Sequence, residues 1–187
     1  MNRTLLKILV GVVFFVSLGL RLYQIGELSS WQDETKEAYS VHQTTIKSGV
    51  MSGRMVMHGV KYAQPPLSYY FQEWGINNLG LSIFGMRIHS AIMGALFCAL
   101  FALLFCNMSD VKGGSAFALL CLIIPVFNHN LIYYAQESRP YMTATFLSLL
   151  WLYVGYIFVF DKEKKGISDF VTLVIAQLAF LLSVGLQ

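Results

Sequence analysis

The sequence predicts an all-α polytopic membrane protein of about five transmembrane helices, and three observations lead to this prediction. Of the 187 residues, 56% are hydrophobic and 12% are charged, so polar residues are too few to cover a soluble domain. The apolar residues gather in runs that approach the length needed to cross ~30 Å of hydrocarbon as a helix. None of these runs alternates along its length as a barrel strand would, which favours helices.

Five membrane spans are expected, at residues 5–20, 83–105, 115–134, 143–160 and 169–187. The third is short and contains Pro125, so we expect it either to recruit Asn128–Tyr134 or to end in a break. The first resembles a signal peptide, but the spans that follow make an uncleaved anchor the simpler interpretation. The last reaches Gln187 without a polar tail, and we therefore expect residues 1–187 to be a single N-terminal transmembrane module of a longer polypeptide.

Basic residues in the short loops set the expected orientation. They all lie on one side if the N-terminus is cytoplasmic, as the positive-inside rule requires; they are Arg3, Lys7, Lys112, Lys162, Lys164 and Lys165. This orientation places the long first loop, residues 21–82, and the segment Asn130–Tyr141 outside the cytoplasm. We expect an integral protein of a bacterial inner (cell) membrane. The net charge of +3 is explained by this topology, and no nucleic-acid partner is predicted.

The first external loop is expected to hold two short helices that lie along the outer membrane surface. Ser30 followed by Asp33 is a helix N-cap signal for the first of them. The second begins after Pro65 and Pro66, since prolines fit a helix start. Its apolar side chains recur with helical spacing and are rich in interfacial aromatic rings; they are Leu67, Tyr70, Phe71 and Trp74.

An adjacent acidic pair, Asp33 and Glu34, stands shortly beyond the first span. Acidic residues number only 10 in this chain, and two of them next to a membrane helix are energetically costly, which indicates a functional role. The pair therefore suggests chemistry on a substrate that itself lies at the membrane surface.

Five short segments occur in an order that points to a family. They are Arg21–Gly26 (RLYQIG), Trp31–Glu34 (WQDE), Gln64–Tyr70 (QPPLSYY), Phe84–Ala91 (FGMRIHSA) and Tyr133–Tyr141 (YYAQESRPY). In them the chain resembles the N-terminal part of GT-C glycosyltransferases, among which dolichyl-phosphate-mannose–protein mannosyltransferases and lipid A aminoarabinose transferases are the most similar. The resemblance implies juxtamembrane helices in the first loop and an active site outside the cytoplasm. It also implies inverting transfer of a sugar from a polyprenyl-phosphate carrier to a protein or glycolipid acceptor.

The resemblance maps the acidic residue of the first-loop motif onto Asp33, with Glu34 beside it. Inverting transfer needs a base for the acceptor hydroxyl and cations for the departing lipid phosphate. Asp33 is therefore the candidate catalytic base, and a helix cap is its alternative role. For Glu34 the alternatives are contact with a metal or acceptor, as a second catalytic carboxylate, and plain surface charge.

Four residues are candidates for binding the substrate: Arg87, Arg139, Gln64 and Tyr141. Arg87 lies near the outer end of the second span, where a charge needs a partner; that partner is a first-loop carboxylate or the lipid phosphate, unless the side chain snorkels to the interface. Arg139 either binds phosphate through its planar fork or is simply solvated. We favour Arg139 for the phosphate and Arg87 for orienting Asp33, with the reverse left open. Many relatives carry His or Lys where this chain has Gln64, which weakens the case for a metal or phosphate contact there.

No metal site is predicted, because the histidines show no metal-ligand spacing; a divalent cation stays open as a cofactor. His89, inside the second span, is expected to be satisfied by a neighbouring helix. Cysteines occur only in or at the ends of apolar runs, where they are expected to pack as small apolar side chains; they are Cys98, Cys106 and Cys121.

Two other classes of function remain open. A transporter or channel component would explain the spans, but the candidate functional residues cluster outside them. A non-catalytic membrane scaffold is the second alternative, and the sequence does not distinguish it from the enzyme.

Overall fold

The computed structural model describes residues 3–27, 29–30, 32, 34–35, 56–57, 60–61, 66–108, 114–160, 171–175 and 177–178. The described part consists of helices and their connecting turns, apart from the two-residue strands β1 (Val56–Met57) and β2 (Val60–Lys61), which pair antiparallel. The helices are α1 (Arg3–Leu22), α4 (Pro66–Leu79), α5 (Ile83–Met108), α6 (Gly114–Phe127), α7 (His129–Ala135) and α8 (Tyr141–Phe160).

Three of these helices are long and apolar enough to cross a membrane. They are Thr4–Leu22, Ile83–Asn107 and Tyr141–Val159, with mean hydropathies of 2.2, 2.2 and 1.7. They correspond to the first, second and fourth predicted spans. On α1 a row of apolar side chains faces away from the protein, as expected of a surface that contacts lipid; it includes Leu5, Ile8, Val12 and Phe15. The chain is thus compatible with an integral membrane protein.

The predicted third span, residues 115–134, is divided into two helices. α6 has 14 residues, and at 1.5 Å per residue its length of about 21 Å is short of a bilayer core. The break is at Asn128, whose side chain accepts a hydrogen bond from the Leu131 N–H at 3.0 Å and so caps α7. Pro125 lies inside α6 and is not the break itself. The expected break is therefore present, and the chain resumes after it as the separate helix α7.

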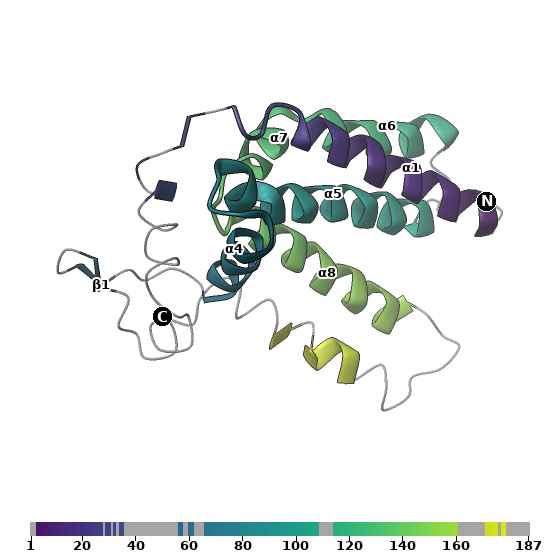
Figure 1. Cartoon of the computed structure of the whole chain (residues 1–187). Helices are drawn as coiled ribbons and strands as arrows, with labels where there is room; N and C mark the ends of the chain where they lie inside the picture. Colours follow the sequence, from purple (N-terminus) through teal and green to yellow (C-terminus); the bar gives the residue numbers. More distant parts are fainter. Residues whose placement is uncertain are drawn as a thin grey trace.

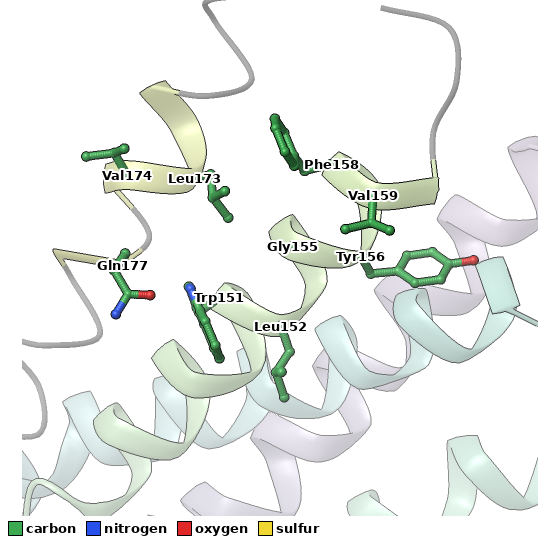
Figure 2. Close-up of a pocket in the computed structure, with 9 residues that line it drawn as sticks. All are labelled: Trp151, Leu152, Gly155, Tyr156, Phe158, Val159, Leu173, Val174 and Gln177. Atoms are coloured by element: carbon green, nitrogen blue, oxygen red, sulfur yellow. The ribbon is translucent and has the colours of Figure 1, made fainter. Parts of the chain in front are cut away.

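Only part of the predicted fifth span lies within the described residues. Residues 171–175 and 177–178 are helical, and a pocket of about 560 Å³ separates them from the second half of α8. Figure 2 shows its lining, which is mostly apolar and holds no charged side chain; it consists of Trp151, Leu152, Gly155, Tyr156, Phe158, Val159, Leu173, Val174 and Gln177.

Helix α5 lies at the centre of the bundle. It contacts α1, α4, α6, α7 and α8, and Figure 1 shows it running alongside α1 and α6. Small side chains on α5, including fully buried Ala91, Ala95 and Ala102, let neighbouring helices approach closely. A core cluster joins α1, α5 and α6; it contains Val13, Cys98, Ala102, Leu122 and Val126.

Helix α4 begins at Pro66, one residue earlier than the sequence predicted, and its backbone lies against the backbone at the start of α5. A Cβ atom added at Gly75 would lie 2.1 Å from the carbonyl oxygen of Gly85, so this contact requires glycine. The face of α4 that packs on the protein carries Gln72, Gly75 and Ile76. The predicted apolar stripe is not this face, because Tyr70 and Trp74 are exposed. Of the other predicted loop helix, only Gln32, Glu34 and Thr35 are described, and all three are helical.

Candidate functional site

A buried ion pair joins Glu34 of the first loop to Arg87 of α5. Nη2 of Arg87 donates to Oε2 of Glu34 at 2.6 Å, and Nε donates to Oε1 at 3.1 Å. This bidentate arrangement is the strongest geometry that a guanidinium and a carboxylate can form. Both residues are 1% exposed. Two of the sequence-based alternatives are therefore wrong: Glu34 is not a surface charge, and Arg87 does not snorkel to the interface.

Arg87 also holds the chain segment that leaves α1. Its Nη1 donates to the carbonyl oxygen of Ile25, and its Nη2 to that of Ser29, both at 3.1 Å. Ile25 is itself buried, at 2% exposed. One side chain of α5 thus fixes both the carboxylate next to Asp33 and the backbone that leads to it.

Ser138, in the loop between α7 and α8, connects this ion pair to α4 and α5. Its N–H donates to Oε1 of Glu34, and its Oγ donates to the carbonyl oxygen of Met86 at 2.8 Å. From α4, Nε2 of Gln72 donates to the carbonyl oxygen of Ser138 at 2.9 Å and to its Oγ at 2.7 Å. Ser138 and Gln72 are both buried. Sequence reasoning named neither as a site residue, although each lies in or next to one of the five segments.

The rest of the α7–α8 loop is also anchored. Nε2 of Gln136 donates to the carbonyl oxygens of Arg21 and Tyr23, at 3.3 and 2.9 Å. Oγ of Ser90 donates to the carbonyl oxygen of Arg139 at 3.5 Å. The loop is therefore tied to the end of α1 on one side and to α5 on the other.

His89 lies next to this network, and its hydrogen-bond partners differ from those expected. Its Nδ1 lies 2.9 Å from the carbonyl oxygen of Met86, and its Nε2 lies 3.1 Å from Oγ of Ser90. Both partners belong to α5 itself, whereas a neighbouring helix was expected. The contact with a neighbour is a stacked one, because the ring lies parallel to Phe71 of α4 with centroids 6.3 Å apart.

A second buried cation, Arg21, lies inside the bundle in the last turn of α1. Its Nη1 donates to Oγ and to the carbonyl oxygen of Ser17. Its Nη2 donates to Sγ of Cys98 and to the carbonyl oxygen of Pro125, both at 3.3 Å. Space for the side chain exists because residue 94 is glycine: a Cβ there would lie 2.6 Å from Nε of Arg21. The sequence had assigned Arg21 to the external loop, and this assignment is wrong.

Of the remaining predicted site residues, two are described by the structure and two are not. Arg139 is half-buried, with its guanidinium carbon 5.8 Å from the ring centre of Tyr141, whose side chain is 47% exposed. Asp33 and Gln64 lie outside the described residues. Within the part of the chain that the structure describes, no group of three or more His, Cys, Asp or Glu side chains could hold a metal ion.

No protein-family model, curated protein or solved structure matches the chain.

Proposed function

We propose that this chain forms the N-terminal transmembrane module of a glycosyltransferase. The enzyme transfers a sugar from a polyprenyl-phosphate donor to a protein or lipid acceptor, with inversion, at the non-cytoplasmic membrane face. The observation that supports this proposal is that three of the five segments in which the chain resembles GT-C enzymes meet at one buried carboxylate. Glu34 comes from the first-loop segment, Arg87 from the segment that opens α5, and Ser138 from the segment between α7 and α8.

The contacts suggest a division of roles among these residues. Glu34 accepts from both Arg87 and Ser138, so we assign it to holding the first loop in place. Asp33, the next residue along the chain, then serves as the base that removes the acceptor proton. Arg139 follows Ser138 directly, and its planar fork suits the lipid phosphate. Gln64 and Tyr141 complete the proposed substrate contacts.

The proposed enzyme crosses the membrane five times, with α6 and α7 together forming the third crossing, and its N-terminus is cytoplasmic. In this arrangement the first loop and the α7–α8 loop lie on the outer side, with α4 along the membrane surface. The support is the distribution of basic residues in the short loops. A bacterial inner membrane is the proposed location.

Labelling with an impermeant maleimide tests this orientation. In a variant whose native cysteines are replaced by alanine, Lys47→Cys is expected to react in intact cells. Lys164→Cys is expected to react only after permeabilisation, because the positive-inside rule places its loop in the cytoplasm. The reverse pattern would place Asp33 in the cytoplasm and overturn the proposed outer active site.

The activity is tested directly with the full-length membrane enzyme. Purified in a detergent without a sugar headgroup, it is incubated with radiolabelled polyprenyl-phosphate mannose or polyprenyl-phosphate aminoarabinose and with peptide or lipid A acceptors. Transfer is expected from a polyprenyl-phosphate donor, and product NMR is expected to show the inverted anomeric configuration. A nucleotide sugar serves as the control donor. Transfer from the nucleotide sugar alone would contradict the proposal, as would solute transport in proteoliposomes without any transfer.

A further inference from the structure

Three tyrosines form a continuous exposed cluster at the α7–α8 loop. The rings of Tyr133 and Tyr134 have centroids 5.5 Å apart at an interplanar angle of 72°, and those of Tyr134 and Tyr141 lie 5.4 Å apart at 69°. These are edge-to-face contacts, which aromatic rings prefer because the ring edge is positive and the face negative. The three side chains are 38%, 41% and 47% exposed. We call Tyr133, Tyr134 and Tyr141 the tyrosine platform.

The backbone beneath the platform is fixed by contacts described above. Tyr134 precedes the loop and Tyr141 follows it, and the loop is tied down by Gln136, Ser138 and the carbonyl oxygen of Arg139. Tyrosine has only two side-chain torsions, so little conformational freedom is lost when a ligand covers the rings. The platform is therefore pre-organised on a rigid loop.

A cation lies beside one ring of the platform. The guanidinium carbon of Arg139 is 5.8 Å from the ring centre of Tyr141, within the range of a cation–π contact. The guanidinium lies over one face of the Tyr141 ring, and together with the exposed rings of the platform it suits a ligand that carries both an anion and a weakly polar, C–H-rich face. A sugar phosphate has both features: its phosphate matches the guanidinium, and the slightly positive C–H face of a pyranose matches the negative face of a tyrosine.

We propose that the tyrosine platform binds the sugar ring of a sugar phosphate whose phosphate is held by Arg139. This inference rests on the proposed function, since the donor of that reaction is a lipid-linked sugar phosphate. A membrane-interface belt also exposes tyrosines. The three rings are held against one another in a fixed edge-to-face geometry, which a belt of interfacial anchors does not need, and this favours the sugar phosphate.

The soluble probe for this site is mannose 1-phosphate, added to the intact chain in a detergent without a sugar headgroup. Saturation-transfer difference NMR is expected to show contact on one face of the sugar ring. Tyr141→Leu and Tyr134→Leu are each expected to weaken binding about two- to tenfold, the size of an aromatic contact. Tyr141→Trp keeps a ring and is expected to bind like the parent chain. Arg139→Gln is expected to remove the preference for mannose 1-phosphate over mannose.

The control is Tyr70→Leu, which removes a tyrosine of similar exposure, 39%, from α4, outside the platform. It is expected to leave binding unchanged, and melting temperatures identify any variant that has lost its fold. Leucine variants that bind mannose 1-phosphate as tightly as the parent chain would overturn the platform, whether or not the enzyme transfers sugar. Leucine variants that weaken only the association of the protein with lipid vesicles would also overturn the platform. Ring-dependent binding in a protein that transfers no sugar would support the platform and overturn the transferase.

Discussion

Replacing Arg87 with alanine is expected to lower the free energy of unfolding by about 3–5 kcal/mol, the usual cost of removing one partner from a buried ion pair. The loss is large because Glu34, 1% exposed, would keep a carboxylate inside the protein without its bidentate partner. The carbonyl oxygens of Ile25 and Ser29 would lose a donor as well. In detergent, this loss appears as a clear fall in the melting temperature. Donor affinity of the protein that stays folded is expected to change little, since Arg87 is engaged inside the protein.

A double variant separates the ion pair from the packing of its side chains. Arg87→Leu combined with Glu34→Gln removes both charges, and it is expected to be more stable than Arg87→Leu alone, since no unpaired charge remains buried. Glu27→Gln, at an exposed position on the same loop, is the control and is expected to stay within about 0.5 kcal/mol of the parent chain. If Arg87→Ala melts like the parent chain and loses donor affinity instead, Arg87 belongs to the phosphate site.

The sequence predicted that Arg87 needs a partner but not which one. The need for a partner follows from the charge of Arg87 and its position in an apolar span. Which partner it has, one of two adjacent carboxylates or a substrate phosphate, depends on how distant segments of the chain pack together. The structure provides Glu34, and the same carboxylate also accepts from the N–H of Ser138. Ser138 and Gln72 escaped prediction because a buried polar residue is recognisable only from its partners, which lie in distant segments of the chain.

Arg21 shows a similar limit of hydropathy analysis. A charged residue at the end of an apolar run is ordinarily assigned to the loop, because a charge inside a bundle is costly. Here α1 itself supplies Oγ of Ser17, neighbouring helices supply Sγ of Cys98 and the carbonyl oxygen of Pro125, and Gly94 leaves room for the side chain. Only Ser17 is close to Arg21 in the sequence. Cys98, Pro125 and Gly94 are distant from it, so no local sequence pattern indicates where the Arg21 side chain lies.

Apolar length predicted three helices that are long and apolar enough to cross a membrane, and it failed at the third run. Helices α1, α5 and α8 each contain an unbroken helix of at least 18 mostly apolar residues, which length and composition are sufficient to predict. In residues 115–134 the average hydropathy hides Asn128, whose side chain caps a new helix. The sequence suggested that Pro125 causes a break. Pro125 instead lies within α6, and the break comes three residues later at Asn128, which caps the next helix.

Asp33→Asn in the full-length enzyme is expected to lower kcat about 10²- to 10⁴-fold, the usual contribution of a general base. The amide keeps the shape of the carboxylate but cannot accept the proton of the acceptor hydroxyl. Asparagine keeps a side-chain oxygen that can accept a hydrogen bond in the first turn of a helix, so the melting temperature is expected to stay close to that of the parent enzyme if Asp33 also has a capping role.

This equivalence separates the two roles that the sequence left open for Asp33. For a base, Asp33→Asn is inactive and stable, and Asp33→Ala is inactive and less stable, because alanine removes the cap at a cost of about 0.5–2 kcal/mol. For a cap alone, Asp33→Asn keeps activity within about threefold of the parent enzyme, well below the usual contribution of a base. Steady-state transfer rates and melting curves for the two variants, with exposed Glu27→Gln as the matched carboxylate control, distinguish these patterns. Full activity in Asp33→Asn would remove the base from the proposed site, while the buried pair of Glu34 and Arg87 would remain as a structural feature.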